Sequence, residues 1–360
     1  MRVGVIGGGL AGALLAWRLA AAVAGDGRVT LVLGGRHRAD ATGASGGAVR
    51  GYEPDPRQCR LATDSLVELL ASPTLQRWGS FQPVESVYLH PAGTTVDLTA
   101  VERGLPGSAE LLTGADLAGL GWAEVPADAV AVRERRAGYL APGRLREAVI
   151  ADAAARRGVR LLPAPLAALA ADDPFRCQVA GRWHDFDTVV IAAGAWTGSV
   201  LAAAGLPADG YRTKAIQYAI HRTGGWRPPQ FVDELTGLYG RPVAGDRLLL
   251  GLPTDRWGVA PDRPPVTAGL ADRAARLAAD RFPKLRLGPI VRTAVAADCY
   301  RSQPSLSLQP VLAGRLFTFT GGAGGSVKTA LAASREAVTQ LVAPGATPAL
   351  TPLGPSEGTS

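Results

Sequence analysis

The first 24 residues place an apolar strand, a glycine-rich turn and an apolar helix in succession, and this order constrains the fold most. An apolar run, VGVI, is followed by Gly7, Gly9 and Gly12 in the spacing G-x-G-x-x-G. Leu10–Ala24 is apolar and rich in Ala and Leu, which predicts a buried helix. Here Gly7 allows a tight turn, Gly9 lets a pyrophosphate approach, and Gly12 lets the helix pack near the strand. The helix N-terminus favours phosphate, so we expect a bound dinucleotide rather than an ordinary buried glycine turn.

Arg28–Leu33 predicts the second strand of the same βαβ unit. Dinucleotide folds usually end this strand, about 20 residues beyond the glycines, in an Asp or Glu that binds the ribose hydroxyls. Leu33 occupies this position, and Gly34, Gly35 and Arg36 follow. We therefore expect the ribose to be held by backbone groups or by Arg36, and the absent carboxylate weakens any case for NAD.

Composition restricts the class of protein. The 360 residues are too many for one small core and predict two domains, and a content of 47% hydrophobic and 19% charged residues predicts a globular chain. The net charge of +7 is scattered without a long basic run, which argues against nucleic acid. The lack of a long apolar run argues against a membrane span, and the early glycine fingerprint argues against a signal peptide. Cys59, Cys177 and Cys299 fit neither a metal spacing nor a disulfide framework, so we expect a cytoplasmic protein without a metal site.

Three later segments end in small residues that suit a flat, phosphate-bearing ligand. Thr42–Ala48, TGASGGA, precedes Arg50 and Tyr52, which we expect beside the ligand ring. Thr188–Ala193 is an apolar strand that returns the chain to the first domain and ends at Gly194, Ala195, Trp196 and Thr197. Leu316–Thr320 is a strand, Gly321–Lys328 a glycine loop and Thr329–Leu341 a helix, which repeats the N-terminal arrangement.

Elsewhere, periodicity and turn residues predict an antiparallel second domain that the chain visits twice. The predicted helices are Arg60–Ala71, Glu110–Leu120, Arg144–Arg157 and Ala268–Asp280. The predicted strands are Ser86–Leu89, Thr94–Leu98, Val159–Leu162, Ala215–Ile220, Leu238–Arg241 and Arg247–Leu252. Pro344–Ser360 is rich in Pro, Gly, Ser and Thr, which predicts a fraying tail.

Five segments in this order resemble the D-amino-acid-oxidase-like FAD amine oxidoreductases, the group of glycine oxidase, sarcosine oxidase and D-amino acid oxidase. They are VGVIGGGLAGALLAWRLA, TGASGG, GYLAPGRLREAV, TVVIAAGAWT and FTGGAGGSVKTA. The resemblance implies an α/β Rossmann-like FAD-binding domain interleaved with an antiparallel or mixed-sheet substrate domain. We expect FAD-binding parts at 1–76, 138–205 and 291–345, substrate-domain parts at 77–137 and 206–290, and a flexible tail at 346–360.

The same resemblance implies which residues contact FAD. The pyrophosphate loop corresponds to Gly7, Gly9, Leu10, Ala11 and Gly12. The loop along the ribityl chain and ring corresponds to Thr42, Ala44, Ser45, Gly46 and Gly47, and Leu166 lies where the family contacts adenine. The second strand end corresponds to Ala192, Ala193, Gly194 and Trp196, and the last flavin loop to Gly322, Ala323, Gly324, Gly325, Ser326, Val327 and Lys328.

Lys328 is expected near the N1–C2=O edge of the flavin, where the family often places a Lys. Hydride transfer puts negative charge on this edge. A Lys about 4 Å away contributes up to about 4 kcal/mol at an effective dielectric constant near 20. The alternative is a solvent-facing residue of the last helix, which the preceding glycines disfavour.

The resemblance identifies the substrate-binding residues less specifically than the FAD-binding residues. The family's carboxylate-binding Arg corresponds to Tyr300 or Arg301, and Arg50, Tyr239 and Arg241 are further candidates, because Arg binds a carboxylate bidentately. Each has a structural alternative, as a surface Arg or a core Tyr. The flavin-linking Cys of sarcosine oxidases corresponds to Asp298, with Cys299 one residue away, so we expect non-covalent FAD. The oxygen-activating Lys of those enzymes corresponds to an aliphatic strand near Leu249, although we still expect molecular oxygen as the acceptor.

The expected reaction is oxidation of the C–N bond of an amino acid or N-substituted glycine, followed by hydrolysis of the resulting imine. The departures at Leu33 and near Leu249 suggest a divergent family member with a specialised substrate. One alternative is an FAD monooxygenase of a specialised biosynthetic pathway, although such enzymes usually carry a Gly-Asp loop where this chain has GGAGGS. A second alternative is a flavin-retaining assembly or RNA-modifying subunit, which nothing in the sequence demands.

Overall fold

The computed structural model describes residues 1–23, 26–35, 40–170, 175–302, 305–312 and 314–342. A six-stranded sheet runs in the order β19-β20-β13-β1-β2-β9. All neighbours in it are parallel except β19, which pairs antiparallel with β20. Its strands are β1 (Arg2–Ile6), β2 (Arg28–Val32), β9 (Val159–Leu162), β13 (Thr188–Ile191), β19 (Ser307–Leu312) and β20 (Leu316–Thr320).

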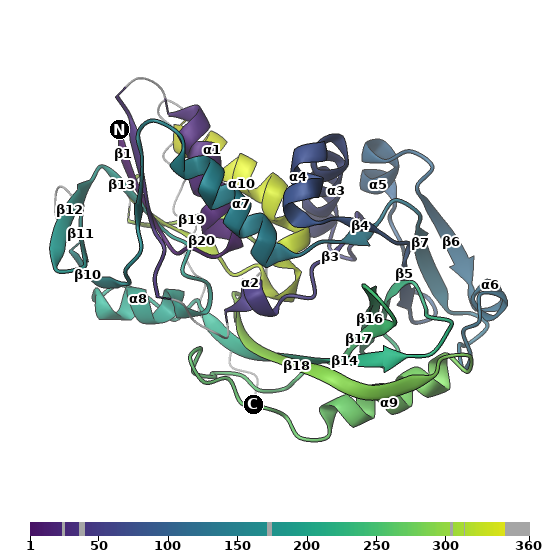
Figure 1. Ribbon diagram of the computed structural model, residues 1–360. Coiled ribbons are helices and arrows are strands. Elements are labelled where there is room, and N and C mark those ends of the chain that lie inside the picture. Colours follow the sequence, from purple (N-terminus) through teal and green to yellow (C-terminus); the bar gives the residue numbers. More distant parts are fainter. Residues whose placement is uncertain (24–25, 36–39, 171–174, 303–304, 313, 343–360) are drawn as a thin grey trace.

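Helices cover one face of this sheet (Figure 1). They are α1 (Leu10–Ala22), α3 (Pro56–Ala71), α7 (Pro142–Ala154) and α10 (Ser326–Val342). α1 lies between the sheet and its neighbours and contributes seven buried residues, because Ala and Gly let adjacent helices approach closely. The opposite face packs on α8 (Thr197–Ala203) and on an antiparallel sheet of β10 (Leu166–Ala170), β11 (Phe175–Val179) and β12 (Arg182–Phe186).

An eight-stranded sheet runs in the order β18-β14-β17-β16-β15-β5-β7-β6 and is antiparallel except where β15 meets β5. Its strands are β5 (Ser86–His90), β6 (Ala109–Thr113), β7 (Val130–Glu134), β14 (Arg212–Thr223), β15 (Gln230–Asp233), β16 (Leu238–Val243), β17 (Arg247–Gly251) and β18 (Leu287–Tyr300). Helix α9 (Leu270–Arg281) covers its outer face through a cluster that includes Phe231, Leu248, Leu250 and Phe282. Because side chains alternate along a strand, the intervening residues of β16 and β17 face inward.

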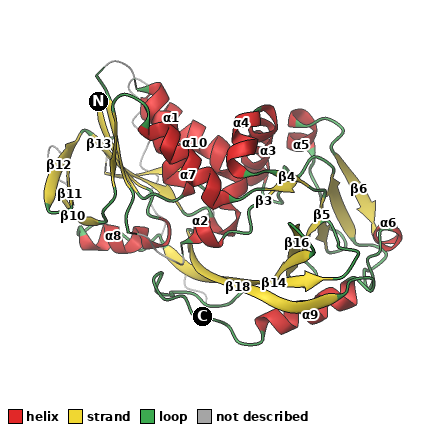
Figure 2. Ribbon diagram, viewed as in Figure 1, coloured by secondary structure: helices red, strands yellow, loops and turns green. Residues whose placement is uncertain are grey.

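The helical layer and the inner face of the eight-stranded sheet lie opposite each other (Figure 2). Between them lie α2 (Ala41–Ala44) and a small sheet in the order β3-β8-β4. The remaining elements are β3 (Ala48–Val49), β4 (Gln82–Pro83), β8 (Gly138–Tyr139), α4 (Pro73–Gly79), α5 (Thr99–Gly104), α6 (Gly114–Gly119), η1 (Gly194–Trp196) and η2 (Ala323–Gly325).

The mixed α/β architecture confirms the predicted fold class, and most predicted elements are present with shifted ends. Two predictions are wrong. Thr94–Leu98 forms no strand, and Glu110–Leu120 is not one helix, because Ala109–Thr113 is β6 and only Gly114–Gly119 is helical. The break falls at Thr113, whose side chain caps α6 together with Asp116. Sequence periodicity also missed β10 to β12.

The six-stranded sheet draws its strands from three separated parts of the chain, in keeping with an interleaved arrangement, and the domain boundaries themselves stay predictions. The proposed tail lies outside the described residues. Among the helices that the structure describes, none combines the length and the apolar character that crossing a membrane requires.

Candidate active site

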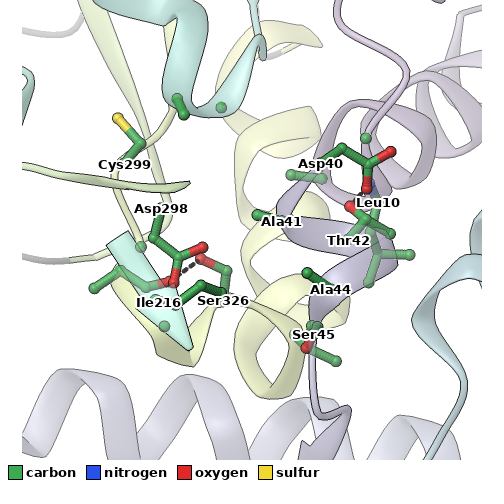
Figure 3. Close-up of a pocket in the computed structure, with 18 of the residues that line it drawn as sticks. Leu10, Asp40, Ala41, Thr42, Ala44, Ser45, Ile216, Asp298, Cys299 and Ser326 are labelled. Atoms are coloured by element: carbon green, nitrogen blue, oxygen red, sulfur yellow. Dashed lines mark hydrogen bonds between the residues drawn. The ribbon is translucent and has the colours of Figure 1, made fainter. Parts of the chain in front are cut away.

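A cavity of about 1200 Å³ lies between the helical layer and the eight-stranded sheet. The carboxyl ends of β1, β2, β13 and β20 all open into it, as expected for a ligand site in an α/β sheet. In Figure 3, Leu10, Thr42, Ala44 and Ser45 lie on one side of the pocket, and Asp298 and Ile216 on the other. The cavity therefore has a glycine-rich helical wall and a sheet wall.

The three glycines of the N-terminal fingerprint are required for different reasons. Gly7 has φ +128°, and a Cβ there would lie 2.3 Å from the Ala192 carbonyl oxygen. A Cβ at Gly12 would lie 2.0 Å from the Gly7 carbonyl oxygen, so Gly12 permits the close packing of helix and strand and does not itself line the cavity. A Cβ at Gly9 would meet only the Thr42 hydroxyl, at 3.5 Å. The protein alone therefore does not require glycine at position 9, whereas a ligand close to the backbone would.

The first turn of α1 is partly closed by a neighbouring loop. The Leu10 N–H donates a hydrogen bond to the Thr42 hydroxyl at 3.0 Å (Figure 3). This N–H is therefore not free for a phosphate, contrary to the simplest expectation for a helix N-terminus. The bond instead fixes the Thr42 loop against the glycine turn.

Every other predicted cofactor residue that the structure describes lines this cavity. They are Gly7, Gly9, Leu10, Ala11, Thr42, Ala44, Ser45, Gly46, Gly47, Leu166, Ala192, Ala193, Gly194, Trp196, Gly322, Ala323, Gly324, Gly325, Ser326, Val327 and Lys328. Arg36 lies outside the described residues. Segments from both ends of the chain thus converge on one site, as the sequence predicted.

Two carboxylates that sequence reasoning missed line the cavity near the end of β2. Asp40 caps α2 and pairs with Arg146 at 2.8 Å, and Glu147 follows Arg146 on α7. Both lie far from the glycines along the chain, so the spacing rule for an acidic residue after the second strand does not detect them. They offer the carboxylate that position 33 lacks.

Lys328 lies in the first turn of α10 with its side chain mostly buried. Its ammonium lies 2.8 Å from Glu53, and Arg50 contacts the same Glu53 oxygen at 2.7 Å. Burial lowers the pKa of Lys328, and Glu53 opposes that change. Burial alone would raise the pKa of Glu53, but the charges of Arg50 and Lys328 outweigh it and hold that pKa below its usual value. Two cations thus share one carboxylate.

Arg50 is held in place by several contacts. Its Nε donates to the Tyr52 carbonyl at 3.1 Å, and its guanidinium lies 4.8 Å from the centre of the Tyr88 ring. The adjacent Glu134 accepts the backbone N–H groups of Gly51 and Tyr52, and burial raises the pKa of its carboxyl. This corner of the cavity therefore brings two cations, Arg50 and Lys328, together with the carboxyl groups of Glu53 and Glu134.

The sheet wall holds three of the predicted substrate residues, Tyr239, Arg241 and Tyr300. The Tyr239 hydroxyl donates to the Gln217 carbonyl at 3.3 Å, and burial raises its pKa. Arg241 donates to the carbonyls of Gly46 and Pro242. Burial and the nearby Asp298 raise the pKa of Tyr300 to about 12, so it stays neutral.

Arg301 does not line the cavity, although Tyr300 does. Its side-chain stem packs where a Cβ of Gly321 would lie, and its guanidinium lies 5.7 Å from the centre of the Tyr211 ring. Successive side chains of a strand point to opposite faces, and Arg301 follows directly after β18. Of these two residues, only Tyr300 therefore lines the cavity.

Asp298 is 7% exposed, and its Oδ2 atom has no hydrogen-bond partner within the described parts of the chain. Burial raises the pKa of this carboxyl to about 7. The next residue, Cys299, also lines the cavity, and burial raises the pKa of its thiol to about 11.

Sequence reasoning missed Glu53. It named Asp298 only as the residue that stands where sarcosine oxidases have a flavin-linking Cys, and it assigned Asp298 no role. A single charged residue within the apolar stretch AVAADCY was a usable signal for Asp298. For Glu53 there was none, because its partner Lys328 is 275 positions away and only the fold brings the two together.

The shape and chemistry of the cavity fit a dinucleotide that carries a flat ring. Open space at Gly9, a helix N-terminus, and a second glycine loop before α10 provide backbone contact for such a ligand. The fold and site thus define the class of dinucleotide-binding α/β proteins.

Comparison with known proteins gives the family. A family model described as "FAD dependent oxidoreductase" (DAO) matches residues 2–340. The chain belongs to this family; it is an oxidoreductase, and its cofactor is FAD. No curated protein sequence matches the chain.

Solved structures share the fold. Glycine oxidase from Geobacillus kaustophilus has a TM-score of 0.72 and 21% identity, with 94% of each chain covered. Iminodiacetate oxidase from Chelativorans sp. BNC1 has a TM-score of 0.71 and 20% identity, with 98% of each covered. L-proline dehydrogenase from P. horikoshii has a TM-score of 0.73 and 18% identity, with 95% of this chain and 93% of that chain covered.

Proposed function

We propose that this protein oxidises the C–N bond of an amino acid or another carboxylate-bearing amine. The observation that carries the proposal is that two cations, Arg50 and Lys328, meet at the cavity wall on the same oxygen of Glu53. Two neighbouring cations favour an anionic ligand, and Arg and Lys are the usual partners of a carboxylate. The names of the structural neighbours, glycine oxidase and iminodiacetate oxidase among them, support the same substrate class.

In this proposal the residues of the chain position the substrate and keep water out. Arg50 and Lys328 orient the carboxylate, while Tyr239, Leu249 and Tyr300 provide a low-polarity surface over the reacting carbon. When bound, FAD supplies the acceptor for the hydride on the carbon next to nitrogen. The amine must be neutral when the hydride leaves, and the imine product hydrolyses in water.

We further propose that FAD is bound non-covalently. A thiolate is the reactive form of Cys, and with its pKa raised to about 11 the Cys299 thiol stays protonated at neutral pH. Asp40 and Glu147 are proposed as the acceptors for the ribose hydroxyls. Molecular oxygen is the proposed final electron acceptor, and the predicted contacts of the cavity residues with FAD belong to the same proposal.

The deciding experiment is an anaerobic titration of the purified yellow protein with primary and N-alkyl amino acids, followed by flavin absorbance. We expect one class of amino acid to bleach the flavin without any nicotinamide. Bleaching by NADPH alone would contradict the proposal and favour the monooxygenase alternative. Denaturation tests the linkage, because non-covalent FAD separates from the precipitated chain.

A further inference from the structure

Arg241 is a part-buried cation in the sheet wall without an acidic partner among the residues that the structure describes. Its recorded contacts are the carbonyls of Gly46 and Pro242 and the ring of Tyr139, 4.0 Å from the guanidinium. Burial lowers its pKa, which reports the cost of removing this charge from water. By contrast, Arg50 and Lys328 share a carboxylate. A cation in this setting is stabilised by an anion from outside the chain.

Gln230 faces the same part of the cavity. Phe231 pairs with Gly240, so the antiparallel register places Gln230 opposite Arg241 on the same face of the sheet. Gln230 is 1% exposed, and its Oε1 atom has no hydrogen-bond partner in the described chain. Its Nε2 makes a long bond of 3.4 Å to the Ser86 hydroxyl. Turning the amide by 180° lets that hydroxyl donate to the oxygen and leaves the NH₂ group as a donor without a partner in the described chain, able to bind a ligand.

Tyr218 contributes a third donor. It is 8% exposed, lines the cavity and packs on Leu249, which lies opposite Arg241 in the register of β16 and β17. Burial raises the pKa of Tyr218, while the charges of Arg292 and Arg241 oppose that change. Its hydroxyl therefore stays protonated and able to donate.

This group is separated from the Arg50 corner. Tyr88, under the Arg50 guanidinium, pairs with Val232, and Val232 pairs with Tyr239. Tyr239 is thus two strands away from Tyr88, and Arg241 lies two residues further along β16. At standard sheet spacings, the backbones of Arg241 and Tyr88 are therefore about 12 Å apart. One carboxylate cannot fill both positions if the side chains keep this separation.

We propose that Arg241, Gln230 and Tyr218 form a second anion subsite, which binds the second carboxylate of a dicarboxylic amine substrate. The inference rests on the proposed function, because it assumes that the substrate's first carboxylate is held by Arg50 and Lys328. An Arg and an amide NH₂ together present donors to both oxygens of a carboxylate. The subsite selects diacids over monoacids of the same length.

The test measures binding before turnover. FAD-loaded protein is titrated with glutarate and with pentanoate, which do not carry an amine, and binding is followed by the change in flavin absorbance. We expect glutarate to bind at least tenfold more tightly, and Arg241→Met to remove this preference. The matched control is Arg247→Met, an exposed Arg on neighbouring β17, which retains the preference. Equal binding of the two acids, or equal weakening of both by Arg241→Met, overturns the subsite.

Arg241 also holds the Gly46 carbonyl, so Arg241→Met can weaken FAD binding itself. Gln230→Glu provides the second variant, because it places a carboxylate in the subsite without touching Gly46. We expect this variant to bind FAD normally and to lose at least tenfold in glutarate affinity. An unchanged affinity overturns the inference.

Turnover then separates the two proposals. N-(carboxymethyl)glycine is compared with N-methylglycine, and glutamate with alanine, in both enantiomers. Reduction by monoacid and diacid amines alike, without an effect of Arg241→Met on their ratio, refutes the subsite but leaves amine oxidation intact. Tight binding of glutarate without flavin reduction by any amine refutes the proposed function but leaves the subsite intact.

Discussion

The two walls of the cavity use different chemistry. The helical wall offers mainly backbone and small side chains, from Gly7–Ala11, Thr42 and Ala44–Gly47, and Gly322–Ser326 provides the same kind of surface next to β18. The sheet wall offers large and polar side chains, among them Tyr218, Gln230, Arg241 and Asp298. A backbone surface suits a ligand that every family member shares, whereas side chains can change with the substrate while the strand remains. We therefore expect the helical wall to recognise mainly the shared cofactor and the sheet wall mainly the particular substrate.

The largest expected effect comes from the glycines of the helical wall. Gly12→Ala places a Cβ against the Gly7 carbonyl oxygen, so we expect a loss of more than about 3 kcal/mol of folding free energy. Gly9→Ala meets no such obstacle, and its extended backbone accepts Ala, so we expect a folded apoprotein that binds FAD at least tenfold more weakly. Chemical denaturation and FAD titration measure the two effects. Normal FAD affinity in Gly9→Ala would show that no ligand approaches this backbone.

A smaller effect is expected when the positive charge of Lys328 is removed from the corner between the two walls. Lys328→Met leaves Glu53 to Arg50 alone and removes one of the two cations at this corner, so we expect about a 100-fold loss in the rate constant for anaerobic flavin reduction at low substrate. The measurement is stopped-flow absorbance with whichever amine reduces the wild-type flavin. Lys284→Met, at an exposed position outside the cavity, is the control. Equal rates of flavin reduction in the two variants would show that Lys328 does not act in the site.

Asp298 gives the sheet wall a pH dependence. In the folded protein the pKa of Asp298 is about 7, above the usual 3.8. The contribution of its protonated carboxyl to the free energy of unfolding is therefore fully present below pH 4 and is lost as the pH rises to about 7. Relative to Asp298→Asn, the wild-type protein should therefore lose roughly 4 kcal/mol of unfolding free energy across this window. Urea denaturation of both apoproteins at pH 4.5 to 8 measures the difference, with exposed Asp280→Asn as the control. A difference that does not vary with pH would show that Asp298 already has a partner.

The smallest effect is expected at Arg301. Its side chain lies over Gly321 and Tyr211 outside the cavity, so Arg301→Gln should change kcat/KM less than threefold. Steady-state oxidation of the best amine substrate is the measurement. A loss greater than tenfold would mean that Arg301 reaches the substrate, and would restore the carboxylate role suggested by its sequence position.

Much of the helical wall could be predicted because its contacts are local. A strand, a glycine loop and a helix N-terminus are adjacent in sequence, and the glycine spacing reports their geometry directly. The same reasoning predicted the Thr42 and Gly322 loops. The prediction of one helix at Glu110–Leu120 was wrong because the apolar residues of this segment fit both the helical and the strand period. The Thr113 cap decides where the helix begins.

The sequence by itself determined the α/β class, the N-terminal glycine fingerprint and the second glycine loop before the last helix, because each depends on residues close together in the chain. Only the tertiary structure decided that Glu53 joins Arg50 to Lys328, that Arg301 points away, and that Gln230 lies opposite Arg241. These relations depend on strand register and on which face a side chain occupies. A shift of one residue in the pairing reverses that face, and no local pattern in the sequence specifies it.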